Sequence, residues 1–518
     1  MKTVKYFLGI FVAAALMSSC VGDLDVTPID PNANTADKAL NSEKAFKQYL
    51  AGVYTGFATS GYDGANGGPS ISGLDGGASQ YIRGLYNLNE LTTDESVCGW
   101  NDQTIKDMHW MTWATTDVFI YSFYSRIFMQ VSAANEFIRE AKKTNVDFAK
   151  KKEYIAEARV LRALSYLHAI DNFGNVPFAT EEDVVGAFPS QISRADLFDY
   201  LESELKDLID GNDLAAPRAN GYGRADKGVA KFLLAKLYLN AEVYTGKARY
   251  SDCANVLKDL MDDGYSLHTT PNGTTYTAYQ DLFLADNDTC TDEIIFAVMQ
   301  DGVNTTTYGS TDYLIFASVG GDMNPAEFGI SSGWGGLRTT PEFYNKFDPD
   351  DLRNLFWTGG KQQASIDDIG EFTHGYGFMK FRNKTSADEA GKELGFVDTD
   401  FPMMRYADVL LMAAECEARG AAVDGYAGFN AVRARAGMDR IATPTLNDII
   451  DERGRELYQE CWRRSDLIRF GLFTTDKYLW QWKGNTKDGQ KVDSYRNLFP
   501  IPASDLQANN KLTQNEGY

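Results

Sequence analysis

The sequence predicts a mainly α-helical protein with a loop-rich face, and two observations support this. In three regions apolar residues recur at three- and four-residue spacing, with alanines at close-packing positions, and each region contains a long helix, a glycine-containing turn and a second helix. Over residues 265–400 this periodicity disappears, while Gly, Asn, Thr and aromatic residues become more frequent. We therefore expect tetratricopeptide-like helix pairs that form a spine around an irregular insert.

The helix pairs fall around residues 150–262 and 404–437, on either side of the insert. The paired helices are expected at 154–168 with 194–209, 228–241 with 250–261, and 406–418 with 426–436. Each pair has to stack on its neighbours to bury its apolar face. Residues 292–298 predict a short strand that leads into a loop at 301–308. Long loops on a rigid scaffold commonly carry function, so we expect the binding face in the insert.

The amino-terminal residues have the pattern of an export signal. A basic start is followed by an apolar run over 7–15 and by small residues before Cys20. The run is too short to span a bilayer, for which about 20 apolar residues are needed. We expect residues 1–19 to be a lipoprotein signal peptide and 20–518 to form one domain. Acyl chains on Cys20 would then hold the protein on a membrane surface.

Composition excludes one class of partner. Fifty basic and 72 acidic side chains give a formal net charge of -22, which repels the phosphate backbone of nucleic acids. Asp23 and Asp25 follow Cys20, so acyl chains rather than a polybasic patch would provide the membrane contact. Five cysteines remain besides Cys20, and Cys416 and Cys461 lie in helical patterns, where we expect buried free thiols.

The sequence offers little support for catalysis. None of the four histidines has the spacing of a metal ligand, and no nucleophile elbow or phosphate-binding loop is present. Asp94 and Glu95 are the best pair of carboxylates, but adjacent residues cannot easily face each other across a substrate. Charged residues at helical spacing are expected to form buried ion pairs that fix helix register: Glu157, Arg159, Arg162, Arg463, Asp466 and Arg469. We expect a non-catalytic protein.

Several short motifs resemble, in their order, those of the SusD/RagB family of surface glycan-binding lipoproteins. The motifs lie at 25–31, 157–166, 171–177, 223–227, 240–246, 451–458, 463–471 and in the aromatic, proline-rich segment 497–507. The resemblance covers essentially the whole mature chain. It implies a lipid-anchored protein of the outer membrane that faces the cell exterior. It also implies a TonB-dependent, SusC-like outer-membrane transporter as the partner.

The starch-binding members of that family hold a helical α-glucan on an arc of two tryptophans and a tyrosine. The resemblance implies that Trp100, Tyr308 and Trp334 form this arc here. The implied polar partners are Asp75, Arg83 and Gln103, with Asn101 adjacent, and Gln103 stands where an asparagine is expected. A curved arc suits a coiled α-1,4-glucan and fits a flat β-1,4-glucan poorly. We therefore expect binding of starch-like α-glucans and malto-oligosaccharides.

Other possibilities remain open. The same receptor role for a fructan or a host oligosaccharide is the first alternative, and a peptide-binding helical-repeat scaffold is the second. Asp286 and Asp288 resemble an oxygen-rich loop at a calcium site of the family, although a solvated acidic turn explains them equally well. No cofactor is required for the expected function, and calcium would be structural.

Overall fold

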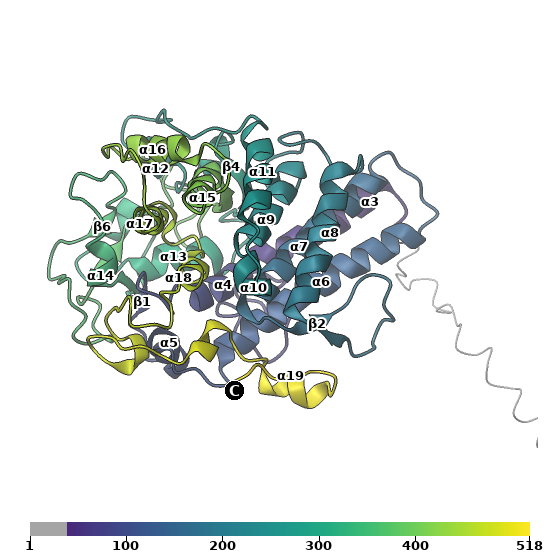
Figure 1. The fold of residues 1–518 in the computed structure, drawn as a ribbon, viewed down its shortest axis with the longest axis horizontal. Helices are drawn as coiled ribbons and strands as arrows, with labels where there is room; N and C mark the ends of the chain where they lie inside the picture. Colours follow the sequence, from purple (N-terminus) through teal and green to yellow (C-terminus); the bar gives the residue numbers. More distant parts are fainter. Residues whose placement is uncertain (1–38) are drawn as a thin grey trace, which may run out of the picture.

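The computed structural model describes residues 39–518, which are mainly helical, as predicted (Figure 1). The predicted signal peptide and Cys20 lie outside the described residues. The helices are α3 (Glu43–Ala58), α4 (Tyr81–Asn89), α5 (Gln103–Trp110), α6 (Val118–Lys143), α7 (Lys151–Asn172), α8 (Arg194–Asp210), α9 (Lys227–Leu239), α10 (Ala241–Thr245), α11 (Tyr250–Met261), α12 (Ala278–Asp281), α13 (Ser310–Ser318), α14 (Pro341–Tyr344), α15 (Tyr406–Ala418), α16 (Gly425–Arg435), α17 (Leu446–Leu457), α18 (Arg463–Arg469) and α19 (Ala503–Ala508). The described part of the chain has no helix long and apolar enough to cross a membrane.

The predicted helix pairs are confirmed. Helix α7 packs on α8, α9 on α11, and α15 on α16. Helix α11 also packs on α15, so two pairs that the insert separates in sequence are joined in the fold (Figure 1). A methyl group on Gly425 would meet the Ala413 backbone at 2.3 Å, so the crossing of α15 and α16 depends on a glycine. Their assignment to the tetratricopeptide class stays a prediction.

Helix α6 was not predicted, although it packs closely on α7. Its buried residues recur at three- and four-residue spacing from Phe119 to Ala141, which is the one-sided pattern expected of an amphipathic helix. Asp117 caps its first turn by accepting bonds from the amides of Phe119 and Ile120, at 2.9 and 3.2 Å.

A single large cluster of buried apolar side chains fills the interior. It extends from Phe46 on α3 to Leu512 near the carboxyl end of the chain. Trp113 is buried in it. Cys416 and Cys461 are buried free thiols, which confirms that prediction.

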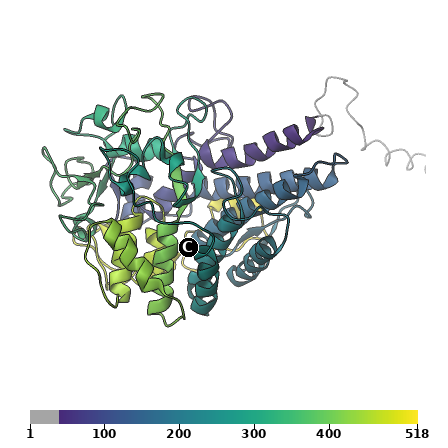
Figure 2. The same cartoon turned by 90° about the horizontal axis from the view of Figure 1, so that it is seen from above.

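The insert is loop-rich, as predicted (Figure 2), but it also contains the buried helix α13 and several short strands. Every residue of α13 is buried, so the helix has no polar face and its sequence shows no amphipathic period. The strands of residues 39–518, inside and outside the insert, are β1 (Val97–Cys98), β2 (Val176–Phe178), β3 (Ser190–Ile192), β4 (Ile294–Val298), β5 (Leu337–Thr339), β6 (Phe356–Trp357), β7 (Tyr376–Phe378) and β8 (Phe401–Arg405). Strand β4 confirms the predicted strand and pairs with β8, while β1, β5, β7 and β6 form one antiparallel sheet in that order.

The charged residues at helical spacing form ion pairs, as expected. Arg159 and Arg162 both bind Glu204, at 2.7 and 2.8 Å, and this joins α7 to α8. Arg469 of α18 binds Glu415 of α15 at 2.7 Å. These pairs fix the positions of neighbouring helices and do not form an open site.

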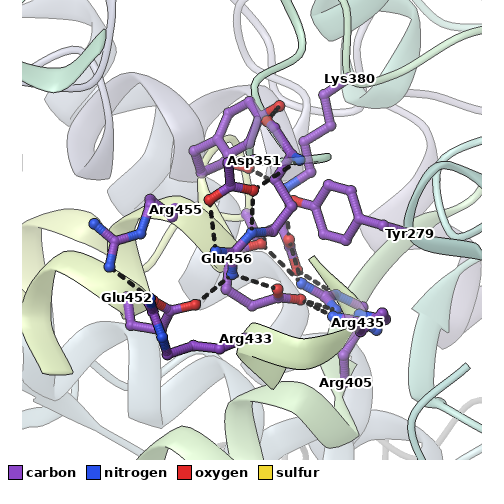
Figure 3. Close-up of polar contacts among 12 residues, drawn as sticks. Tyr279, Asp351, Lys380, Arg405, Arg433, Arg435, Glu452, Arg455 and Glu456 are labelled. Carbon is purple, nitrogen blue, oxygen red and sulfur yellow. Dashed lines mark hydrogen bonds and ion pairs between the residues drawn. The ribbon is translucent and has the colours of Figure 1, made fainter. Parts of the chain in front are cut away.

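A larger buried charge network surrounds Glu456 on α17 (Figure 3). Arg353 and Arg405 lie 3.2 and 2.9 Å from its carboxylate oxygens, and Arg435 also contacts it. The network further includes Glu293, Asp351, Lys380, Arg433, Glu452, Arg455 and Glu460. Burial raises the pKa of Glu456, but the three guanidiniums outweigh it and lower the pKa to about 2.

Candidate functional site

Strand pairing brings Trp100 and Trp334 together from distant parts of the chain. Trp100 follows β1 and Trp334 precedes β5, and these two strands pair antiparallel. The indole nitrogen of Trp100 donates to the carbonyl of Trp334 at 3.1 Å. The amide of Trp334 donates to the carbonyl of Phe316 on α13 at 2.7 Å. The pairing of β1 with β5 and the bond from Trp334 to α13 thus hold the two tryptophan rings in place.

Tyr308 completes the arc that the sequence predicted. Its ring centroid lies 6.2 Å from that of Trp334, which in turn lies 6.3 Å from that of Trp100. The successive ring planes are tilted by 58° and 49°, so the three rings form a bent surface and not a flat shelf. Tyr308 is 38% exposed and the two tryptophans are half-buried. We call these three residues the aromatic arc.

Arg83 on α4 contacts the aromatic arc. Its guanidinium carbon is 5.5 Å from the ring centroid of Trp100 and 4.5 Å from that of the buried Tyr313. One terminal nitrogen donates to the carbonyl of Tyr308 at 3.2 Å. A methyl group on Gly77 would meet Arg83 and Tyr308 at 2.9 Å each. The positive group therefore contacts the two ends of the arc.

The other predicted polar side chains form their hydrogen bonds with residues outside the arc. Asp75 lies two residues before Gly77, and its carboxylate accepts from the amide of Ala78 at 2.7 Å. Gln103 donates to Asp107 within α5 at 3.0 Å, and Asn101 accepts a bond from Lys106. The structure thus brings Arg83 to the arc, while the carboxylate of Asp75 bonds within its own turn. The side-chain bonds of Asn101 and Gln103 are made with α5.

Four further residues contact the arc and were not predicted. Phe316 stacks on Trp334 with centroids 4.9 Å apart, and Tyr313 lies edge-on to Trp100 at 5.9 Å. Phe396 lies 5.6 Å from Tyr308, whose hydroxyl donates to Asn66 at 2.9 Å. The apolar run of α13 was the available signal for the first two. No sequence pattern points to the others, which lie in irregular loops.

The carboxylate pair considered for catalysis is structural. Asp94 and Glu95 are both buried. Asp94 accepts two bonds from Arg463 at 2.8 Å, and although burial opposes it, this contact lowers the pKa of Asp94 below its usual value. Burial raises the pKa of Glu95 to about 8. Both groups belong to the interior.

The two acidic residues considered for calcium do not form a cluster of carboxylates. Asp286 accepts from the backbone amide and the hydroxyl of Ser386, at 2.9 and 2.7 Å. Asp288 is exposed. In residues 39–518 no group of three or more His, Cys, Asp or Glu side chains could hold a metal ion. Structural calcium at Asp286 and Asp288 stays a prediction.

Comparison with known proteins defines the class of this fold. Surface glycan-binding protein A from Bacteroides fluxus has a TM-score of 0.70 at 22% identity, with 92% of this chain and 100% of that chain covered. The same protein from Bacteroides thetaiotaomicron, in complex with laminarihexaose, has a TM-score of 0.70 at 20% identity, with 91% and 99% covered. The fold is thus that of surface glycan-binding proteins.

Sequence comparison gives the family. The SusD family model matches residues 352–518. Starch-binding protein SusD from Bacteroides thetaiotaomicron is 32% identical to this chain, with the whole of both chains covered. The chain therefore belongs to the SusD family, whose members bind carbohydrates and are not enzymes.

Proposed function

We propose that this protein captures starch-like α-1,4-glucans and malto-oligosaccharides on the aromatic arc. The observation that carries the proposal is the bent surface of Trp100, Trp334 and Tyr308, whose planes turn by 49° and 58° from ring to ring. A coiled glucan presents successive sugar faces in changing orientations, and tilted rings can follow them. Identity of 32% to a starch-binding relative over the whole chain supports the same substrate class.

Arg83 and Asp75 provide the polar part of the proposed site. Arg83 contacts the two ends of the arc, and its guanidinium retains further donors for sugar hydroxyls. Asp75 keeps one carboxylate oxygen beyond the one that caps its own turn. A few placed polar groups around aromatic rings are typical of small-ligand sites. Asn101 and Gln103, next to Trp100, would have to exchange their bonds within α5 to take part.

The binding should be weak. Each aromatic contact contributes about 1 kcal/mol beyond the area that it buries. Association costs offset much of this, which leaves a dissociation constant on the order of micromolar to millimolar. Weak binding suits a surface receptor that has to release its cargo.

The proposal includes a location and a partner. The protein would be exported by residues 1–19, anchored through acyl chains on Cys20, and exposed on the outer membrane. It would pass the glycan to a TonB-dependent outer-membrane transporter of the SusC type. Acylated protein in the membrane fraction of wild-type cells, and soluble protein after Cys20→Ala, would support the anchor.

Substitution of the tryptophans tests the site. We predict that Trp100→Ala and Trp334→Ala each abolish detectable binding of maltoheptaose in titration calorimetry, because each removes a ring from a weak site. Trp357→Ala is the matched control, since this half-buried tryptophan lies on β6 at the opposite edge of the same sheet. Unchanged binding in both arc variants would contradict the site assignment.

Another glycan is the second candidate, and one observation favours it. A solved structure with a TM-score of 0.70 contains laminarihexaose, so this fold also presents other sugars. The receptor role and the arc would be the same, and only the preferred chain would differ.

A further inference from the structure

We propose that Phe396 extends the aromatic arc by a fourth ring and makes binding depend on glycan length. This inference rests on the proposed function. The ring of Phe396 lies 5.6 Å from that of Tyr308, close to the spacing between the rings of the arc. The four rings thus follow one another in the order Trp100, Trp334, Tyr308 and Phe396.

The position of Phe396 is not that of a core side chain. It is half-buried, and it belongs to none of the clusters of apolar side chains in the described part of the chain. Tyr308, its ring partner, is likewise outside these clusters. Core packing therefore does not explain why a large ring stands at this place.

The backbone on both sides of Phe396 is firmly held. The amide of Val397 donates to Asp312 on α13 at 3.0 Å. Asp398 accepts from the amides of Gly302 and Lys392, at 3.0 and 2.6 Å. These bonds join the segment to the loop before Tyr308, so the ring is fixed in place before a ligand arrives and little ordering cost remains.

The same segment also borders the loop that carries Trp334. The carbonyl of Leu394 accepts from the amide of Ser331 at 2.9 Å. Leu394, two residues before Phe396, and Val303, next to Gly302, are 47% and 56% exposed, so apolar side chains near Phe396 are open to solvent. A glycan that continues past Tyr308 would meet this surface, whereas a short one held by the three rings of the arc would not.

The test compares two chain lengths in titration calorimetry with the wild-type protein and two variants. Phe396→Leu keeps an apolar side chain but removes the flat ring, and Phe396→Tyr keeps the ring. We expect Phe396→Leu to weaken maltoheptaose binding about three- to tenfold and maltotriose binding less than about twofold. Phe396→Tyr should bind both as the wild type does. Phe188→Ala, at an exposed phenylalanine of the loop between β2 and β3, is the control and should change neither.

Three results would overturn the inference. Unchanged maltoheptaose binding in Phe396→Leu would show that the ring makes no contact. An equal loss at both lengths, or the same loss in Phe396→Tyr, would indicate disturbance of the three-ring arc. Wild-type protein that binds no glycan would instead overturn the proposed function, so the two failures can be told apart.

Discussion

Two glycines decide how closely the binding groups can approach one another. A methyl group on Gly336 would meet the indole of Trp100 at 2.8 Å, so the absence of a side chain there lets the ring lie against β5. Gly77 plays the same part between Arg83 and Tyr308, each 2.9 Å from the position that its methyl group would take. The geometry of the arc thus depends on residues that carry no chemistry of their own.

Gly77→Ala is predicted to weaken glycan binding, because the new methyl group must displace Arg83 or the backbone beside Tyr308. We expect a loss of about tenfold for maltoheptaose, with the same melting temperature to within a few degrees. Gly76→Ala is the neighbouring control, since its methyl group would meet only the Ser60 hydroxyl oxygen, at 3.6 Å. Equal affinity of both variants would show that this close approach is irrelevant to binding.

Some residues of the candidate site were predicted from the sequence, and others were not. Trp100, Tyr308, Trp334 and Arg83 were found through motif resemblance, and the structure brings them together. Phe396 was missed because it lies in an irregular loop, where only the folded chain reveals its neighbour Tyr308. The side-chain bonds of Gln103 could not be foreseen, because Asp107 on the next turn competes for its amide.

At the level of elements, a buried charge network as well as apolar packing fixes α17. Glu456 faces Arg353, Arg405 and Arg435, which come from a loop, from β8 and from α16. Removal of one charged side chain from such a buried network leaves its partners buried without an opposite charge. The network therefore specifies how α17 sits against its neighbours.

Glu456→Gln should lower the free energy of unfolding by about 3 kcal/mol at pH 7. The folded pKa of Glu456 is about 2 and the unfolded value is 4.5, so its stabilising effect is present above pH 4.5 and is lost as the pH falls towards 2. Urea unfolding should thus show a gap between wild type and variant that narrows from pH 7 to pH 3.

Glu182→Gln is the control for this measurement. Glu182 pairs with Lys142 on the surface, where its side chain is 75% exposed, so the loss should be below about 1 kcal/mol. A variant of Glu456 as stable as the wild type at pH 7, or a gap that does not change with pH, would contradict this view of the network.

Some of the helices can be predicted from the sequence and others cannot. The amphipathic helices α7, α8, α9, α11, α15 and α16 were predicted close to their observed bounds. Helix α13 was missed because it is buried on all sides. The buried residues of α6 do recur at helical spacing, so this helix could have been predicted from the sequence. Contact between α11 and α15 could not be predicted, since an insert of more than a hundred residues separates them in sequence.

For the whole molecule, the helical spine and the loop face have separate tasks. Helix α4 packs on α6 and on α13, while α13 packs on β5 and β5 pairs with β1, and these last three elements present the aromatic arc. The family follows from the whole-chain match to a SusD protein, whereas the proposed preference for α-glucans rests on the tilt of three rings. Substrate choice is therefore the central claim to test.

Titration calorimetry with the protein that begins after Cys20 tests this claim most directly. The ligands are maltoheptaose, α-cyclodextrin, inulin, cellohexaose and laminarihexaose. We predict heat of binding with maltoheptaose and α-cyclodextrin, because both present the curved α-1,4-glucan surface that the tilted rings of Trp100, Trp334 and Tyr308 can follow. Binding of another ligand in the panel, with no heat of binding for these two, would contradict the α-glucan assignment. The chain would still belong to its family.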